Sequence, residues 1–302
     1  MTPDLSVVIS TFNRPAMVRQ AVAAVRAQTW PGPIETVVVH DRSEPDRSIE
    51  SSDPLRPVRV VANHRRPGLP GSRNAGAEVA TAPFLGFCDD DDLWLPDKAA
   101  RQLDLLDRTG AEVSTTGIEI LVGDLVVERR GTGDELSLDE LVRRRRVEAN
   151  MVTAIARTDA FWNGIGPLDE DVPGGYAEDY EWVLRAARRR PIAVAPEPLV
   201  QVRWQSASHF RDRWLTIDRA LGYLEDRVPE FRGDARGWAR VHGQRAFARA
   251  AAGHRRSAVD AAARTLRRSP AEPRAWLALA VATGLVPAER ITAELQRRGR
   301  GI

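Results

Sequence analysis

The chain has 302 residues, of which 43% are hydrophobic and 28% are charged, and its formal net charge is +2. This composition is sufficient for a buried core and excludes a disordered or fibrous protein. No apolar run approaches the roughly 18 residues of a membrane-spanning helix, and Asp4 precedes the first apolar segment, so we expect a soluble, cytoplasmic protein. The single cysteine, Cys88, lacks partners for a disulfide or a thiolate zinc site.

Charge is distributed unevenly along the chain. Residues 211–302 contain 19 arginines against 10 acidic residues, a net +9, whereas residues 1–210 carry a net −7. An acidic front half suits cation chemistry and repels phosphate, so no nucleic acid partner is expected. The basic tail is compatible with contact to an anionic acceptor, peripheral contact to a membrane, or a merely solvated arginine-rich surface.

The first 90 residues alternate short apolar runs with helical patterns. The runs predict strands at residues 5–10, 35–40, 58–62 and 83–88. Between them, helices are predicted at residues 15–28, which begin with a proline, and at about 72–80. This alternation favours a mostly parallel α/β sheet covered on both faces, and such sheets bind ligands beyond the carboxyl ends of their strands.

The middle of the chain completes this domain. Gly123-Asp124 between two apolar runs predicts a hairpin, and Ser137 with Glu140 forms a capping box. Arg143 to Arg146 end the helix that follows, and we expect them to form a solvated face. The predicted elements are a helix from Pro96, a strand at 113–117, a helix at 138–146, a strand at 151–157, a helix at 178–190 and extended segments at 192–204.

After about residue 210 the pattern becomes wholly helical. Residues 245–284 place small residues at helical spacing, with Gly253 between two helices and Pro270 after the second, and resemble one degenerate tetratricopeptide-type unit. We therefore divide the chain into an α/β domain at residues 1–209 and a helical domain at 210–302. Because such units are rarely stable alone, we expect these helices to pack on the front domain or on another copy of the chain.

Four consecutive carboxylates, Asp89 to Asp92, directly follow the fourth predicted strand. Like charges at this spacing repel one another unless a cation or hydrogen bonds hold them. Hard oxygen ligands suit Mg²⁺ or Mn²⁺, and the glycine and terminal glutamate of an EF-hand loop are missing. The alternative is an acidic cap for the helix at Pro96, but a cap needs only one carboxylate. The run therefore predicts a divalent metal site.

Several motifs together resemble the family 2 glycosyltransferases of GT-A fold. They are LSVVISTFNRP, VVVHDRS, LPGSRNAGAEVA, FLGFCDDDDLWLPDK and GPLDED…GGYAEDYEWVLRAA, which follow the family's order over about residues 5–204. The resemblance implies a Rossmann-like, mostly parallel mixed sheet flanked by helices. It also implies an inverting hexosyltransferase that moves a sugar from a nucleotide diphosphate sugar, expected to be a UDP-sugar, to an acceptor hydroxyl.

The resemblance assigns roles to individual residues. Asp91 and Asp89 are the implied metal ligands, and Asp89 and Asp90 would address the ribose and the donor sugar. Asp41 matches the family's base-reading aspartate, although His40-Asp41-Arg42-Ser43 replaces the usual two acids and glycine before the serine. The full set of expected donor contacts is Ser10, Thr11, Asp41, Ser43, Arg73, Asn74, Asp89 and Asp90.

The reaction also needs a base that takes the proton of the acceptor hydroxyl. Glu178 and Asp179 open a predicted helix after two glycines, where acids also complement the helix dipole. In the family a Glu-Asp pair opens the equivalent helix, so the resemblance implies Asp179 as the base and Glu178 as its supporting residue. His209 lies just past the last extended segment, and we expect a surface histidine there rather than a metal ligand.

The sequence is compatible with two other functions. A nucleotidyl or phosphoryl transferase would use the same metal and phosphate chemistry, although the chain has no P-loop. A non-catalytic protein that binds a sugar nucleotide or a partner would be built around the helical tail. Release of nucleotide in the presence of Mn²⁺ separates an enzyme from a binding protein.

Overall fold

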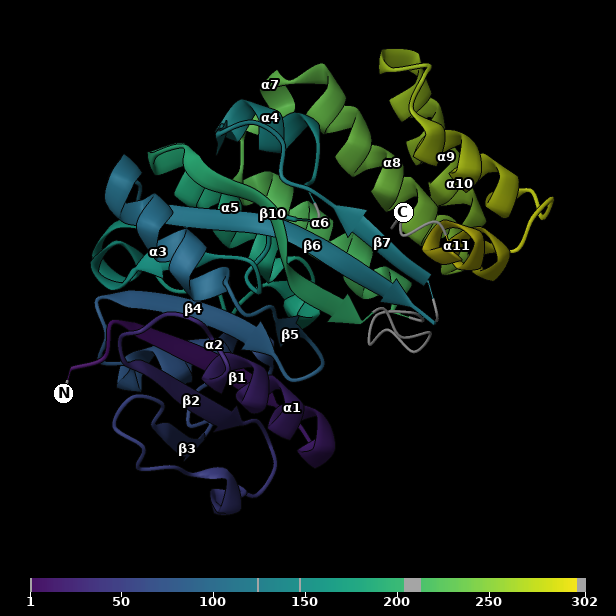
Figure 1. Ribbon diagram of the computed structural model, residues 1–302. Coiled ribbons are helices and arrows are strands. Elements are labelled where there is room, and N and C mark those ends of the chain that lie inside the picture. The colour runs from purple at the N-terminus through teal and green to yellow at the C-terminus, as the bar shows by residue number, and fades with distance from the viewer. Residues whose placement is uncertain (1, 124, 147, 204–212, 298–302) are drawn as a thin grey trace.

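The computed structural model describes residues 2–123, 125–146, 148–203 and 213–297 (Figure 1). Its centre is one mixed sheet with the strand order β3-β2-β1-β4-β9-β6-β10-β5, to which β7 is added beside β6 and β8 beside β10. The strands β1 (Leu5–Thr11), β2 (Ile34–His40), β3 (Val58–Ala62) and β4 (Phe84–Asp89) run parallel. The predicted mostly parallel α/β sheet is therefore confirmed.

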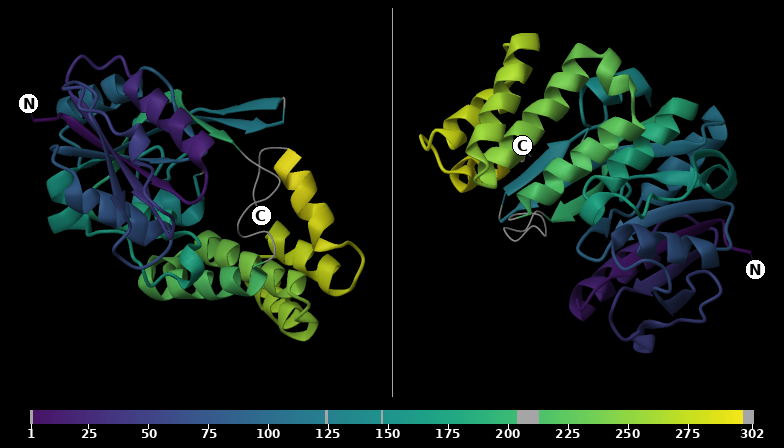
Figure 2. Two further views of the ribbon diagram at one scale, coloured as in Figure 1. Left: turned by 90° about the horizontal axis from the view of Figure 1, so that it is seen from below. Right: turned by 180° about the vertical axis from the view of Figure 1, so that it is seen from behind.

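The second half of the sheet is mixed. β9 (Ile155–Arg157) runs antiparallel between β4 and β6 (Val113–Val122), and β6 runs parallel to β10 (Ile192–Arg203). β6 and β7 (Leu125–Arg129) form the hairpin predicted at Gly123, and this hairpin projects from the sheet (Figure 2). The remaining short strands are β5 (Leu93–Trp94) and β8 (Glu135–Leu136).

Helices cover both faces of the sheet and create two hydrophobic cores. α1 (Pro15–Arg26) and α3 (Lys98–Thr109) cover one face (Figure 1). α2 (Leu69–Val79), α4 (Leu138–Arg143) and α5 (Glu178–Arg189) lie on the other. Shorter helical turns are η1 (Arg47–Ile49), η2 (Ala160–Ile165) and η3 (Pro173–Gly175).

Two predicted elements are shorter than expected. The helix capped by Ser137, whose Oγ accepts from the Glu140 N–H at 3.3 Å, ends at Arg143 and not at 146. The strand predicted from residue 151 begins only at Ile155, because the Asn150 carboxamide oxygen accepts from the N–H groups of the next residues. These hydrogen bonds, 3.0 Å from Val152 and 3.2 Å from Thr153, curl the chain into a turn.

The C-terminal part of the chain is helical, as predicted. α6 (Trp214–Arg227) and α8 (Ala235–Ala251) contribute Ile217, Leu221 and Val241 to the same hydrophobic core as Phe87 of β4. α9 (Arg255–Arg268), α10 (Pro273–Ala282) and α11 (Ala288–Arg297) form a separate, alanine-rich core with the end of α8 (Figure 2). The short α7 (Glu230–Gly233) joins α6 to α8.

The tetratricopeptide character of these helices and the division into two domains stay predictions. The boundary proposed at residues 209 and 210 lies outside the described residues. None of the helices in the described ranges is long and apolar enough to cross a membrane.

Glycines allow α2 to lie directly on the sheet. A Cβ at Gly76 would lie 2.3 Å from Cγ1 of Val8 and 2.9 Å from Cγ2 of Val39. One turn earlier, a Cβ at Gly71 would lie 2.0 Å from the carbonyl oxygen of Arg66. The two glycines therefore fix how closely α2 approaches β1, β2 and the loop after β3.

We predict that Gly76→Ala lowers the free energy of unfolding by about 1–3 kcal/mol, because the added methyl group overlaps Val8. Gly233→Ala is the matched control, since an added Cβ there meets no atom within 4 Å. The control should gain up to about 1 kcal/mol from helix propensity alone. Urea unfolding of both variants checks this, and equal stabilities would contradict the close packing of α2.

Candidate functional site

The predicted site residues meet at the carboxyl edge of the sheet. Ser10 of β1 lies opposite Asp89 of β4 in the parallel register, and β2 ends beside them at His40. Three non-glycine residues with left-handed backbone flank this edge: Asn13 (φ 53°), Arg42 (φ 49°) and Ala177 (φ 64°). Such conformations cost on the order of 1–3 kcal/mol each and concentrate at functional sites.

The acidic run forms a compact oxygen cluster. Carboxylate oxygens of Asp89, Asp91 and Asp92 lie within 4.8 Å of one another. Burial, and then the charges of Asp89 and Asp91, raise the pKa of Asp92 well above its ordinary value. Burial also raises the pKa of Asp91, with further contributions from Asp89 and Asp90. This set of hard donors, held together against its own repulsion, fits Mg²⁺ or Mn²⁺.

Asp92 is a site residue that the sequence analysis did not assign. It is 4% exposed and accepts a hydrogen bond from the Arg203 N–H at 3.3 Å. In the sequence, only its position in the run of four acids indicates that Asp92 belongs to the site.

Asp90 turns away from this cluster toward β1. It accepts from Thr11 Oγ1 at 2.8 Å and pairs with Arg14 at 3.0 Å. Burial raises the pKa of Asp90, and these two donors oppose the increase. Arg14 also reaches Asp91 at 2.9 Å, while the buried Ser10 hydroxyl has no hydrogen-bond partner among the described residues.

Asp41 organises the adjoining edge of the sheet. Its buried carboxylate accepts from Asn63 Nδ2 at 2.8 Å, from the Gly68 N–H at 3.1 Å and from Arg42 Nε at 2.9 Å. Both oxygens therefore already have donors from the chain itself. Ser43 lies 3.4 Å from Nδ1 of His40, whose pKa is lowered by burial.

Phe12 lies beside this carboxylate and was not singled out from the sequence. The ring is 45% exposed, and the Arg42 guanidinium lies over it at 4.7 Å from the centroid. A large exposed aromatic directly after a buried strand is the signal that would have identified it.

Arg73 links the two acidic halves of the site. Its guanidinium is 3% exposed, and it donates to Asp89 Oδ1 at 2.6 Å and to Glu178 Oε1 at 2.8 Å. α2 therefore carries a buried cation that joins the end of β4 to the start of α5.

Asn74, the next residue, is directed elsewhere. Its amide donates to the Leu168 carbonyl at 2.9 Å and to Glu170 at 2.8 Å, and its oxygen accepts from the Leu168 N–H at 3.0 Å. The side chain thus anchors the loop before α5 and does not point at the acidic cluster.

Glu178 and Asp179 stand at the first turn of α5. The approach to this helix is bent by left-handed backbone at Gly174, Gly175 and Ala177. Glu178 is 4% exposed, and burial followed by the charge of Asp179 raises its pKa to about 7, against the opposing charge of Arg73. Asp179 is more accessible, with 22% of its side chain exposed.

Within the described residues, the polar contacts of Asp179 are on one of its oxygens. Oδ1 accepts from the Tyr180 N–H at 2.7 Å and from Arg145 at 3.3 Å. The expectation that Arg143 to Arg146 form a solvated face is therefore wrong for Arg145. It is also wrong for Arg146, which is 9% exposed and pairs with Glu148 at 3.0 Å, because the chain turns inward after α4 ends.

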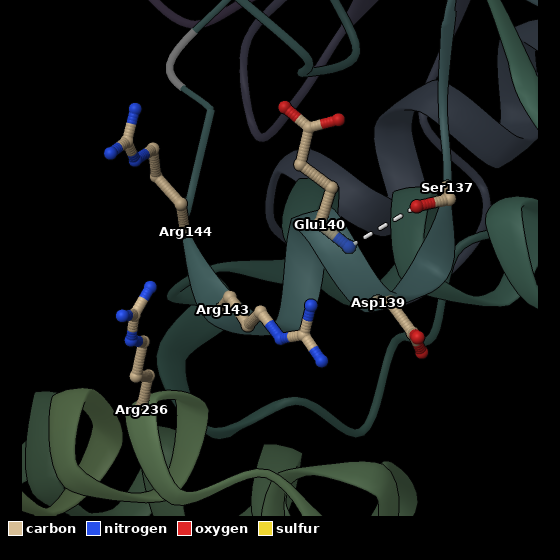
Figure 3. A pocket seen from close by; sticks show the side chains of 6 residues that line it. All are labelled: Ser137, Asp139, Glu140, Arg143, Arg144 and Arg236. Carbon is tan, nitrogen blue, oxygen red and sulfur yellow. Dashed lines mark hydrogen bonds between the residues drawn. The ribbon is translucent and has the colours of Figure 1, made fainter.

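A separate hollow lies between α4 and α8 (Figure 3). Arg143 pairs there with Asp234 at 2.7 Å. Its lining holds three arginines and two acids, an excess of one positive charge that the ion pair of Arg143 with Asp234 offsets. Its lining residues are Ser137, Asp139, Glu140, Arg143, Arg144 and Arg236, and no predicted donor, metal or base residue is among them.

The chain is similar to known glycosyltransferases in sequence and in fold. It is 28% identical over 152 residues to the succinoglycan biosynthesis protein ExoO of Rhizobium meliloti, a match that covers 50% of this chain and 43% of that protein. The chain thus spans less than half the length of this curated relative.

His209 lies outside the described residues and is not placed by the structure.

Two solved structures share the fold. One is S. aureus TarS 1–349 in complex with UDP-GlcNAc, with a TM-score of 0.62 and 17% identity, covering 98% of this chain and 92% of that one. The other is the mannosyltransferase PcManGT from Pyrobaculum calidifontis in complex with GDP-Man and Mn²⁺, with a TM-score of 0.56 and 17% identity, covering 98% and 85%. Residues 6–157, half of the chain, match the model of glycosyl transferase family 2. The chain belongs to glycosyl transferase family 2, and its sheet and flanking helices have the GT-A fold.

Proposed function

We propose that the chain is a metal-dependent, inverting glycosyltransferase, with residues 1–209 as its catalytic domain. It would transfer a sugar from a nucleotide diphosphate sugar to an acceptor hydroxyl. The observation that carries this proposal is the pair of hydrogen bonds of Arg73, at 2.6 Å to Asp89 and 2.8 Å to Glu178. These bonds place the acids suited to a metal and the acids suited to a base on opposite sides of one guanidinium.

The metal half would consist of Asp89, Asp91 and Asp92. A divalent cation bound there would neutralise the charge that develops on the departing diphosphate. The Mn²⁺ in the complex of the archaeal mannosyltransferase supports this assignment. Asp90, held by Thr11 and Arg14, would face the donor from the end of β1.

The nucleoside half would lie at the ends of β1 and β2. Phe12 and Arg42 form a stacked pair beside Asp41, which offers a flat surface to a nucleobase. Ser10, with its unpartnered hydroxyl, and Ser43 would supply further hydrogen bonds. The UDP-GlcNAc complex of TarS favours a UDP-sugar as the donor.

Geometry favours Asp179 over Glu178 as the base. The pKa of Glu178, about 7, suits a base, but its side chain is enclosed and already bound to Arg73. Asp179 is partly exposed, and its Oδ2 forms no hydrogen bond or ion pair with the described residues. We propose that this oxygen accepts the proton of the acceptor hydroxyl, while Glu178 holds the start of α5 to Arg73.

The role of the basic tail stays a prediction. Contact with an anionic acceptor, contact with a membrane and self-association would each use its exposed arginines. The competing idea of a non-catalytic sugar-nucleotide binder predicts donor binding without any release of nucleotide.

We predict that Asp91→Ala abolishes Mn²⁺-dependent binding of UDP. The loss should exceed the roughly 10–100-fold that removal of an outer-shell partner costs at a metal site. Without metal, the melting temperature should be unchanged or higher, because one of the mutually repelling carboxylates is gone. Titration calorimetry with UDP and Mn²⁺ measures the loss, with Asp104→Ala on the exposed face of α3 as the control. Equal binding by wild type and Asp91→Ala would contradict the metal role.

We predict that Glu178→Gln removes part of the pH dependence of stability. Because the pKa of Glu178 is about 7 in the folded chain and near 4.5 when unfolded, folding favours the protonated form. Its contribution is therefore complete below pH 4.5 and is lost as the pH rises through 7. Without metal, the wild type should lose roughly 1–3 kcal/mol more than the variant between pH 5 and pH 8 in urea unfolding. Parallel pH curves for the two proteins would show that this carboxyl is not perturbed.

We predict that Asp179→Asn separates binding from transfer. The donor and metal residues are untouched, so the affinity for UDP with Mn²⁺ should stay near that of the wild type. The rate of nucleotide release should fall by roughly 10²–10⁴-fold, the usual contribution of a positioned base. If UDP affinity falls as much as the rate, Asp179 is a nucleotide ligand and not the base.

A further inference from the structure

Helix α8, which lies in the C-terminal part of the chain, is connected to Asp179 through a series of side-chain contacts. Its link is Arg240, which is 6% exposed and donates to the Tyr180 hydroxyl at 2.7 Å and to the Val142 carbonyl at 3.3 Å. Tyr180, 2% exposed, donates in turn to the Leu141 carbonyl at 2.6 Å. A guanidinium and a phenol thus join α4, α5 and α8 at one point.

The same phenol ring supports the arginine that contacts Asp179. The Arg145 guanidinium lies over the Tyr180 ring at 5.2 Å from its centroid and reaches Asp179 Oδ1 at 3.3 Å. The Arg240 guanidinium lies over the same ring at 5.3 Å. The Tyr180 ring therefore contacts both guanidinium groups, and the charge of Arg145 acts on Arg240.

Burial of the charged Arg240 side chain is unfavourable for stability. In the described part of the chain it forms no ion pair with a carboxylate, and its Nε has no hydrogen-bond partner. Burial lowers its pKa. A methionine would fill a similar volume without an enclosed charge, so packing alone does not account for an arginine here. What the guanidinium adds is a rigid set of donors that holds a carbonyl of α4 and the Tyr180 hydroxyl together.

We infer that Arg240 is a positioning residue for Asp179, and that α8 therefore belongs to the acceptor side of the site. The Arg240 guanidinium holds Tyr180 and the end of α4 in place. Tyr180 and the end of α4 in turn position Arg145. Arg145 and the Tyr180 N–H then fix Oδ1 of Asp179. Oδ2 is then the oxygen turned toward the acceptor. The inference rests on the proposed role of Asp179 as the base, and it gives part of the helical segment a role in transfer.

The test uses the full chain and water as the acceptor, with UDP release from UDP-GlcNAc in the presence of Mn²⁺ as the assay. Arg240→Met should lower kcat by roughly 10–100-fold, the effect of a small misplacement of a reacting group, while KM for UDP-GlcNAc and the affinity for UDP stay near wild type. Its pH–rate profile should shift, and Arg240→Lys should restore part of the rate. Arg268→Met is the matched control, because Arg268 stacks on Trp238 of the same helix at 4.6 Å but is exposed.

Tyr180→Phe provides a second variant in case Arg240→Met does not fold. It keeps the ring under Arg145 and removes only the hydroxyl, so it should lower kcat in the same direction. A double variant, Arg240→Met with Asp179→Asn, should be no slower than Asp179→Asn alone, because both changes act on one group.

The outcomes separate the two proposals. Wild-type rates in both Arg240→Met and Tyr180→Phe would overturn the inference and leave the proposed function intact. The same holds if the loss in the double variant equals the sum of the losses caused by Arg240→Met and Asp179→Asn alone. A rise in KM with unchanged kcat would also overturn it. A wild-type chain that binds UDP-GlcNAc with Mn²⁺ and never releases UDP would overturn both.

Discussion

The buried guanidinium of Arg73 is the interaction on which the site depends. The carboxyl edge gathers Asp89 to Asp92 from β4 and Glu178 with Asp179 from α5, and these charges repel one another. Arg73 joins the two groups by hydrogen bonds to Asp89 and Glu178, and Arg14 adds an exposed cation at Asp90 and Asp91. Burial keeps water from screening Arg73, so its charge acts on both carboxylates at close range. This one side chain therefore bridges the acidic cluster after β4 and the acids that open α5.

The position of Arg73 depends in turn on packing. Gly76 lets α2 lie against Val8 and Val39, and Gly71 lets its first turn touch the carbonyl of Arg66. Side chains at these positions would lift the helix and withdraw the guanidinium from the edge. Asn74 holds the other flank by its hydrogen bonds to Leu168 and Glu170. In the motif LPGSRNAGA, small residues let α2 lie close to the sheet, and Arg73 and Asn74 form the hydrogen bonds that hold the site together. The need for this close packing accounts for the high density of small residues in the motif.

Local signals predicted the sheet and the acidic run, whereas long-range contacts determined the rest. Continuous apolar runs identified β1, β2 and β4, and the carboxyl-edge rule then brought Asp41 and Asp89 together. Residues whose role depends on distant partners were not predictable. Arg145 looked like a solvated helix end, and its contact with Asp179 exists only because α4 packs on α5. Arg240 lies 60 residues from Tyr180, in a helix rich in alanine, glycine and arginine that has no local signal for such a contact.

The shared core of the sheet and the C-terminal helices has a consequence for the order of events during synthesis. Val241 of α8 completes the hydrophobic core that also holds Phe87 of β4, although it lies about 150 residues later in the chain. At about 5–20 residues per second, these two partners emerge roughly 8 to 30 s apart. During that interval the core lacks the part that α8 supplies, and the sides of α4 and α5 that carry Val142 and Tyr180 stay uncovered until α8 emerges. The nascent chain is therefore most exposed to aggregation and to chaperone binding just before its last quarter is made.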